Sequence, residues 1–284
     1  MPEIALVTDS TAYIPPEIVD RYSLTVVPQV LIWGENTYQD GVDIQPDEFY
    51  SRLQNSKIMP TTSQVSIASM KTTFEDLTGK GYHVIGIFIS SKFSGTIQSA
   101  IQAIDMMGSA GKNVTILDSL STSMALGFQV LAAARVLEDG ANLEDVIATA
   151  EKARDHTGVF FAVDTLEFLH RGGRIGGAKR FFGTALNVKP VLTLNDGHIE
   201  AVEQIRTKKK AIARVMELVE EQVKGRSPIH LASLHANAEA EAKELLEMAS
   251  KRVDVSESIF TTVSPVVGTH AGPGTVGLAY MADM

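Results

Sequence analysis

The feature that most constrains the fold is an alternation of short, β-branched apolar runs with helix-period segments over the first half of the chain. Helical segments at 66–79 and 94–108 carry apolar residues at three- and four-residue spacings, on one face. The apolar runs that we predict as strands lie at 4–7, 24–32, 84–89 and 114–117. Strands that alternate with helices form parallel sheets covered by helices, so residues 1–158 are predicted as one α/β domain.

The pattern changes after residue 158, where strand-like segments follow one another more closely. Asn195-Asp196-Gly197 between two apolar segments indicates a β-hairpin. Residues 259–267 and 276–281 are predicted as a final pair of strands. Helices are predicted at 165–170, 179–186, 208–223 and 238–251. Residues 159–284 are therefore predicted as a second α/β domain, and each domain is expected to hold a mostly parallel or mixed sheet.

Charge and composition exclude several classes of protein. The 284 residues carry a net charge of −9, opposite in sign to that of most nucleic-acid-binding domains. The chain has no cysteine, which excludes disulfides, thiolate metal sites and cysteine nucleophiles. No apolar stretch approaches the length of a membrane span, and the first residues do not resemble a signal peptide. We expect a soluble protein located in the cytoplasm.

Small polar clusters follow the predicted strands of the first domain, at the edge where open α/β sheets bind ligands. Asp9-Ser10-Thr11, Ser90-Ser91 and Asp118-Ser119 each come directly after a strand. Thr62-Ser63 and Ser94-Gly95-Thr96 precede predicted helices, where hydroxyls and free backbone N–H groups favour a carboxylate or a phosphate. Serine and threonine are also common helix N-caps, so each cluster alone fits simple capping as well.

Two glycine-rich segments are candidate ligand loops. His270 lies in Gly268-Thr269-His270-Ala271-Gly272-Pro273-Gly274, which we predict as a tight loop between two strands, from which an imidazole can donate to an anion. A lone histidine can equally be structural. The second segment, residues 171–177, lacks both the P-loop and the dinucleotide-binding fingerprints.

Basic residues concentrate around that second segment. Residues 171–210 contain nine Lys or Arg and three Asp or Glu, a net charge of +6 in a chain of −9. Such a segment is typical of a docking surface for an acidic partner or a phosphate. Arg171, Arg174 and Arg206 are the better candidates, because arginine makes directional paired contacts, whereas residues 208–210 also fit a solvated helix edge.

Two further constellations are weak. Asp40, Asp43, Asp47 and Glu48 lack the spacing of a calcium-binding loop, so helix caps and surface turns explain them better. Ser94, His270 and Asp118 supply the residue types of a nucleophilic triad, but Ser94 does not stand in a Gly-x-Ser-x-Gly elbow.

The polar motifs together resemble the DegV family. They occur in the family's order and span nearly the whole chain: Val7-Thr8-Asp9-Ser10-Thr11, Pro60-Thr61-Thr62-Ser63-Gln64, Ser90-Ser91-x-x-Ser94-Gly95-Thr96, Asp118-Ser119, Thr165-Leu166-Glu167-Phe168-Leu169-x-x-Gly172-Gly173-Arg174-Ile175 and His270-x-Gly272-Pro273-Gly274. The resemblance implies two α/β domains with a lipid site between them, which bind one long-chain fatty acid. It also implies the acyl-binding subunit of a bacterial fatty acid kinase, with a separate ATP-binding subunit that phosphorylates the carboxylate.

Specific roles follow from the resemblance. It implies that Thr62 and Ser94 hydrogen-bond the fatty carboxylate, with Ser63, Gly95 and His270 around it. It assigns Arg171, Arg174 and Arg206 to the surface that meets the kinase subunit. It implies no metal or cofactor besides the fatty acid, no nucleic-acid partner, and no catalysis by this chain alone.

Two alternatives from other functional classes remain at this point. One is an acyl hydrolase that uses Ser94 and His270. The other is a regulatory module that binds some other small anion. Chain-length preference, tunnel-lining residues, oligomeric state and the use of the acyl phosphate are not encoded in any motif of the sequence.

Overall fold

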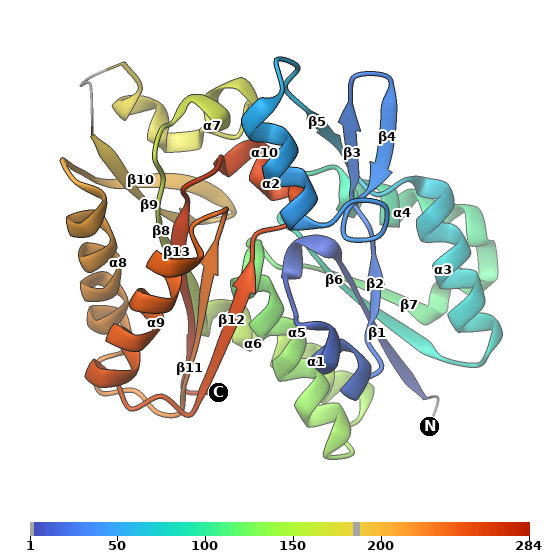
Figure 1. Ribbon diagram of the computed structural model, residues 1–284. Coiled ribbons are helices and arrows are strands. Elements are labelled where there is room, and N and C mark those ends of the chain that lie inside the picture. The colour runs from blue at the N-terminus through green and yellow to red at the C-terminus, as the bar shows by residue number, and fades with distance from the viewer. Residues whose placement is uncertain (1–2, 184–187) are drawn as a thin grey trace.

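The computed structural model describes residues 3–183 and 188–284. Two sheets lie on opposite sides of a central helical layer, and a small third sheet lies above the first (Figure 1). The α/β class predicted from the sequence is confirmed, as is the covering of both larger sheets by helices.

The first sheet has four strands in the order β2-β1-β6-β7, and all of its neighbours are parallel. Its strands are β1 (Ile4–Asp9), β2 (Thr25–Val27), β6 (His83–Phe88) and β7 (Val114–Asp118). The predicted strand at 24–32 is wrong as a single element. Pro28 lies between β2 and β3, where it has no N–H for a strand ladder, and the chain continues into a different sheet.

The second sheet has six strands in the order β10-β9-β8-β13-β11-β12 and is mixed, since β11 and β12 are parallel and the other neighbours antiparallel. Its strands are β8 (Thr157–Ala162), β9 (Lys189–Asn195), β10 (His198–Ile205), β11 (Ile229–His235), β12 (Glu257–Thr262) and β13 (Val276–Ala282). The predicted hairpin is confirmed: Asp196 and Gly197, with φ of 48° and 77°, join β9 to β10.

The predicted final strand pair is wrong in two respects. β11 lies between β12 and β13, so these two strands are not neighbours. The residues between them form a helix, α10 (Pro265–Ala271), where the sequence suggested the end of a strand and a loop. The predicted helix at 179–186 corresponds in part to the 3₁₀ helix η3 (Gly176–Phe181), while residues 184–187 lie outside the described residues.

A three-stranded antiparallel sheet, which the sequence did not predict, lies above the first sheet in the order β4-β3-β5 (Figure 1). Its strands are β3 (Val30–Trp33), β4 (Asn36–Gln39) and β5 (Thr61–Ser63). Helix α10 packs against β3, β5, α2 (Pro46–Asn55) and α7 (Glu167–Arg171). This sheet therefore holds β5 next to the C-terminal part of the chain.

Helix α5 (Ser123–Glu138) forms the centre of the molecule and packs against β1 and β6 of the first sheet and β8 and β13 of the second. Its first twelve residues are all buried. The outer faces are covered by α3 (Ile67–Gly79) and α4 (Thr96–Met107) on the first sheet, and by α8 (Lys208–Val223) and α9 (Glu239–Arg252) on the second. The remaining helical elements are η1 (Ser10–Ala12), α1 (Pro16–Arg21), η2 (Gly108–Asn113) and α6 (Leu143–His156).

The chain passes from the first sheet to the second between Asp118 and Thr157, through α5 and α6. The division into domains at residue 158 stays a prediction, because α5 contributes to the packing of both sheets. Among residues 3–183 and 188–284, no helix combines the length and apolar character of a membrane span.

Candidate functional site

A cavity of about 200 Å³ lies between the two larger sheets. One water molecule needs roughly 10–15 Å³ on this measure, so the space suits an organic ligand rather than a single solvent molecule. Its apolar wall draws on both halves of the chain and includes Ile89, Val159, Phe161, Leu234, Val263 and Val266. Its polar wall includes Gln29, Thr62, Ser63, Ser94, Gly95 and His270. The cavity is therefore lined both by apolar side chains and by hydrogen-bonding groups.

The structure brings all five residues predicted around the carboxylate to this cavity, from three separate elements. Thr62 and Ser63 lie on β5, Ser94 and Gly95 precede α4, and His270 lies on α10. Thr62 Oγ1 lies 2.7 Å from His270 Nε2, although 208 residues separate them in sequence. Hydroxyl donors and a ring nitrogen thus gather where an anionic group can meet them.

His270 is presented by a helix, not by the predicted loop. Pro265 begins α10, and Ser264 caps it by accepting a hydrogen bond from the backbone N–H of Val267. The buried Asp40 carboxylate accepts from the N–H of Val266 at 3.2 Å and from Ser10 Oγ at 2.6 Å. Gly272, with φ of 79°, ends the helix. Long-range contacts therefore fix the histidine more firmly than a loop would.

The imidazole of His270 is neutral at pH 7. Burial lowers its pKa to about 4, and the nearby Arg174 guanidinium acts in the same direction. Its Nδ1 atom is buried without a hydrogen-bond partner among the described residues. A buried N–H without a partner costs more than an unfilled acceptor, so this geometry favours the proton on Nε2. Nε2 then donates to Thr62 Oγ1 and leaves the Thr62 hydroxyl proton for a ligand.

A second chain of hydrogen bonds leads to Ser94. The buried Gln29 donates from Nε2 to Thr96 Oγ1 at 2.9 Å, and Thr96 Oγ1 lies 2.9 Å from Ser94 Oγ. Thr96 has one hydroxyl proton and two acceptors, Ser94 Oγ at 2.9 Å and Gln29 Oε1 at 3.2 Å; when it donates across the shorter contact, to Ser94, the Ser94 hydroxyl proton is free to point into the cavity. Sequence reasoning missed Gln29, and no local signal marks it, because its partner lies 67 residues away.

Gly95 allows close packing at this wall. A Cβ atom at position 95 would overlap the side-chain amide of Gln64, which itself donates to Ser99 Oγ at 3.1 Å. Gly95 is also the N-cap of α4, so the first backbone N–H groups of that helix lie next to Ser94. A larger residue at this position would therefore displace the Gln64 amide from the wall.

The structure separates the three arginines predicted for docking. Arg174 lines the cavity, where its Nε donates to the carbonyl of Phe93 at 3.1 Å and its Nη1 to the carbonyl of Gly172 at 2.7 Å. Arg171 is exposed and pairs with Glu167. Arg206 is exposed at the end of β10, with no hydrogen bond or ion pair to any residue that the structure describes.

Other basic residues of this segment have structural partners. Lys208 and Lys189 both pair with Asp164, at 3.0 and 3.1 Å. Of the three arginines predicted for docking, Arg171 and Arg206 are the exposed ones.

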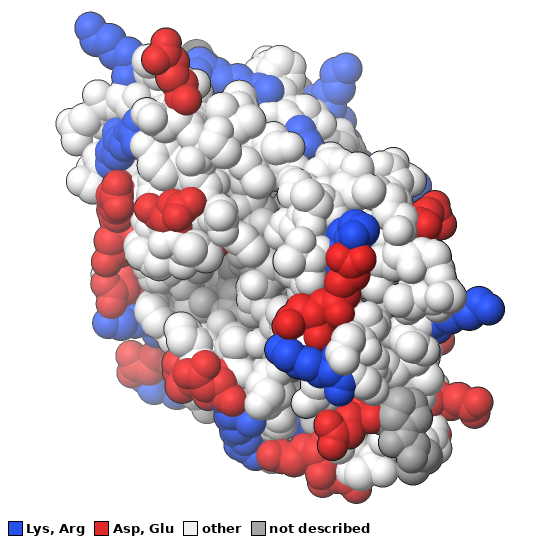
Figure 2. All heavy atoms as spheres, turned by 90° about the vertical axis from the view of Figure 1, so that its right-hand side faces the viewer, with Lys and Arg blue, Asp and Glu red and all other residues white. Residues whose placement is uncertain are grey.

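The face on the right of Figure 1 carries acidic and basic side chains among uncharged residues, as a solvated surface does (Figure 2).

The geometry does not assemble a nucleophilic triad. His270 Nε2 bonds to Thr62 rather than to Ser94, and its Nδ1 lacks the acidic partner that a triad requires. The Asp118 carboxylate instead accepts from the backbone N–H groups of Ser91 and Leu120. Within the described residues, no group of three acidic or histidine side chains is arranged to hold a metal ion.

Comparison with known proteins places these features in a family. A model described as "Uncharacterised protein, DegV family" matches residues 3–283. A DegV domain-containing protein of Halalkalibacterium halodurans is 40% identical over the full length of both chains. Protein DegV of Bacillus subtilis is 37% identical, with 98% of each chain covered.

Solved structures agree with the fold. A Thermus thermophilus DegV family protein, described with fatty acid binding, has a TM-score of 0.92 at 36% identity and covers 99% of this chain and 100% of its own. Bacillus subtilis DegV, described as a fatty acid binding protein, has a TM-score of 0.89 at 36% identity with the same coverage. A stearic acid-binding protein of Eubacterium ventriosum has a TM-score of 0.93 at 26% identity and covers 99% and 98% of the two chains.

Proposed function

This chain belongs to the DegV family, and from that premise we propose that it binds one long-chain fatty acid in the cavity between its two larger sheets. We further propose that it presents the carboxylate to a separate ATP-dependent kinase subunit. The observation that carries the proposal is the meeting of Thr62, Ser94 and His270 at a cavity that is also lined by apolar side chains of both halves of the chain.

The apolar wall supplies the affinity in this proposal. An acyl tail of about 15 methylenes at roughly 0.8 kcal/mol each gives on the order of 12 kcal/mol before the costs of association. Phe161, Leu234 and Val263 are among the side chains that would contact the tail. The tail therefore determines how tightly the ligand binds, and the headgroup determines which way it lies.

The polar wall would hold the carboxylate in a fixed orientation. Burying a charged carboxylate without hydrogen-bond donors costs much free energy. The hydroxyl groups of Thr62 and Ser94 would therefore donate to the carboxylate and keep it ionised. The neutral His270 contributes through its bond to Thr62, and Thr96 through its bond to Ser94. Both hydroxyls then act as donors of fixed direction.

The kinase step follows from that orientation. One carboxylate oxygen attacks the γ-phosphorus of ATP held by the partner, a new P–O bond forms, the bond to the β-phosphate oxygen breaks, and ADP leaves. This chain would contribute positioning, while the partner holds the nucleotide. The exposed cations Arg171 and Arg206 are candidates to meet that partner. The cytoplasmic location stays a prediction.

The headgroup assignment is tested by comparing a fatty acid with the fatty alcohol of equal chain length. We define the acid preference as the Kd of the alcohol divided by the Kd of the acid. The proposal predicts a large acid preference that falls at least about tenfold in Thr62→Val or Ser94→Ala, since each removes a hydrogen bond to a charged group. Equal binding of acid and alcohol by the unmodified protein would contradict it.

The kinase step is tested separately. The protein loaded with oleate is mixed with ATP and a purified bacterial fatty acid kinase subunit, and acyl phosphate is trapped with hydroxylamine as the hydroxamate. The proposal predicts hydroxamate only when all three components are present. Hydroxamate without the kinase subunit, or none with it, would overturn the presenting role while leaving lipid binding intact.

A further inference from the structure

Unpartnered polar atoms cluster at the cavity. Among the described residues, buried side-chain nitrogen and oxygen atoms without a hydrogen bond include those of Thr8, Thr122, Ser123 and His270. All of these residues except Thr8 line the cavity. Native proteins leave few such groups unpaired, so their concentration at one cavity calls for an occupant that can form hydrogen bonds there.

Thr122 and Ser123 stand apart from the carboxylate-binding residues. They begin α5, the helix that separates the two sheets, whereas Thr62, Ser94 and His270 lie on β5, before α4 and on α10. Ser123 is 5% exposed, and its Oγ has no partner among the described residues. The Thr122 side chain, at the N-cap, makes no capping hydrogen bond. The buried start of a sixteen-residue helix therefore adds unfilled donors to the cavity wall.

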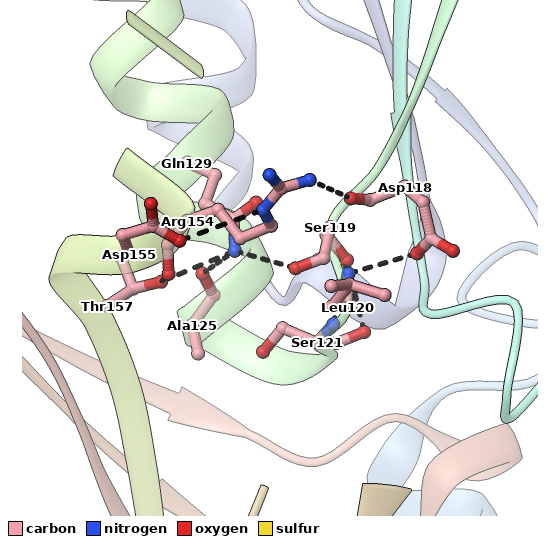
Figure 3. Close-up of polar contacts among 9 residues, drawn as sticks. All are labelled: Asp118, Ser119, Leu120, Ser121, Ala125, Gln129, Arg154, Asp155 and Thr157. Atoms are coloured by element: carbon pink, nitrogen blue, oxygen red, sulfur yellow. Dashed lines mark hydrogen bonds and ion pairs between the residues drawn. The ribbon is translucent and has the colours of Figure 1, made fainter. Parts of the chain in front are cut away.

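The turn that leads into α5 is, by contrast, fully engaged (Figure 3). The Asp118 carboxylate accepts from the N–H of Leu120, and Ser119 Oγ accepts from the N–H of Ser121. Gln129 Nε2 lies 3.2 Å from the carbonyls of Ser119 and Ala125. The side-chain hydroxyls of the next two residues, Thr122 and Ser123, thus lack partners, although the polar groups of the preceding turn are hydrogen-bonded to one another.

We propose that Thr122 and Ser123 form a second polar subsite in the acyl cavity, which selects a long-chain fatty acid that carries a hydroxyl group on its chain. This inference rests on the proposed function and names its substrate class. A chain hydroxyl can both donate and accept, so it can satisfy two serine or threonine hydroxyls at once. A plain hydrocarbon chain at this place leaves both oxygens unpaired.

The proposal predicts opposite effects on affinity for chain hydroxyls that reach Thr122 and Ser123 and for those that do not. A hydroxyl buried in an apolar tunnel without a partner weakens binding, because its hydrogen bonds to water are lost. A hydroxyl that reaches Thr122 and Ser123 recovers those bonds and also satisfies the protein's own groups. Only one position of the hydroxyl along the chain should therefore be favoured, and hydroxyls at other positions should reduce affinity.

The test compares stearic acid with a set of monohydroxystearic acids that differ in the position of the hydroxyl. For each acid, the Kd is measured by displacement of a fluorescent fatty acid from the full chain. We expect one isomer to bind at least as tightly as stearic acid, and the ratio of its affinity to that of stearic acid to fall about 3- to 10-fold in Thr122→Val. Ser123→Ala should lower the same ratio.

The chain offers matched controls. Thr122→Ser keeps a hydroxyl at the same position and should retain the ratio of the unmodified protein. Ser121→Ala removes a neighbouring buried hydroxyl that does not line the cavity, and it should leave the ratio unchanged. Thermal unfolding of each variant identifies any that fails to fold, and the remaining variant at 122 or 123 then carries the comparison.

Two results would overturn the subsite. One is that every hydroxy isomer binds more weakly than stearic acid to the unmodified protein. The other is that Thr122→Val and Ser123→Ala leave the ratio as Ser121→Ala does. Failure of stearic acid itself to bind would instead count against the proposed function, so the two failures are distinguishable.

Discussion

The imidazole of His270 packs directly on the backbone of Gly172, so closely that a Cβ atom at position 172 would overlap Nδ1. Gly172 has φ of −74°, a conformation that any residue adopts, so its lack of a side chain serves the histidine rather than the backbone. The glycine-rich segment after α7 thus positions a side chain from α10, near the other end of the chain.

Gly172→Ala should therefore displace His270 without straining the backbone. Loss of the Thr62–His270 contact frees Thr62 to rotate, and we expect the acid preference to fall at least about tenfold while fatty alcohol binding changes little. Gly79→Ala is the matched control, because a Cβ there meets nothing within 4 Å. An unchanged acid preference in Gly172→Ala would show that His270 does not orient the headgroup donors.

The bond from Thr96 to Ser94 predicts a difference between two substitutions at one position. Thr96→Val removes the hydroxyl that bonds Ser94 and one partner of the Gln29 amide, so we expect the acid preference to drop about 3- to 10-fold and stability to fall by about 1 kcal/mol. Thr96→Ser keeps the hydroxyl and should retain the acid preference. Binding assays measure the acid preference and urea denaturation measures the stability. An equal acid preference in Thr96→Val and Thr96→Ser would show that the Thr96 hydroxyl does not orient Ser94.

His270 gives the ligand-free protein a defined pH dependence. Because burial lowers its pKa to about 4 from 6.5, the unfolded chain binds a proton between these pH values and the folded chain does not. The contribution of His270 to stability should therefore fall by on the order of 3 kcal/mol as pH drops from 6.5 toward 4, while Asp40, whose pKa burial raises to about 6, contributes in the opposite direction. Proton NMR of the imidazole checks the pKa directly, and a midpoint above 6 would contradict the buried, neutral histidine.

Arg206 is predicted to act on the partner and not on the lipid. Arg206→Ala should leave the Kd for oleate unchanged, since the residue is exposed and outside the cavity lining, and should lower acyl-phosphate formation several-fold at limiting kinase subunit. Arg21→Ala, which removes another exposed arginine, is the control. Equal rates of acyl-phosphate formation by Arg206→Ala and Arg21→Ala would show that Arg206 is not part of the docking surface.

Local sequence patterns predicted most of the fold. The alternation of strands and helices and the turn at Asp196-Gly197 depend on neighbouring residues, and the structure contains them. Pro28, which interrupts the predicted strand at 24–32, is a local signal that could have been used. The family resemblance, confirmed by comparison, rests on motifs that are short but ordered.

The parts that could not be predicted depend on contacts between distant residues. Helix α10 runs into a glycine-rich stretch at its C-terminal end, and its first turn is held by Asp40, 226 residues away from Val266. The link from Gln29 to Ser94 joins residues 65 or more positions apart, and the unpaired hydroxyls of Thr122 and Ser123 are buried at the start of α5, which packs between the two sheets. No local pattern encodes which buried hydroxyl is left without a partner.

Native mass spectrometry of the purified full chain tests the central claim most directly. If the cavity holds an acyl chain with its carboxylate at Thr62 and Ser94, the protein should carry one long-chain fatty acid per chain, or take one up when oleate is added. A chain that stays at its ligand-free mass in the presence of excess oleate would contradict the account.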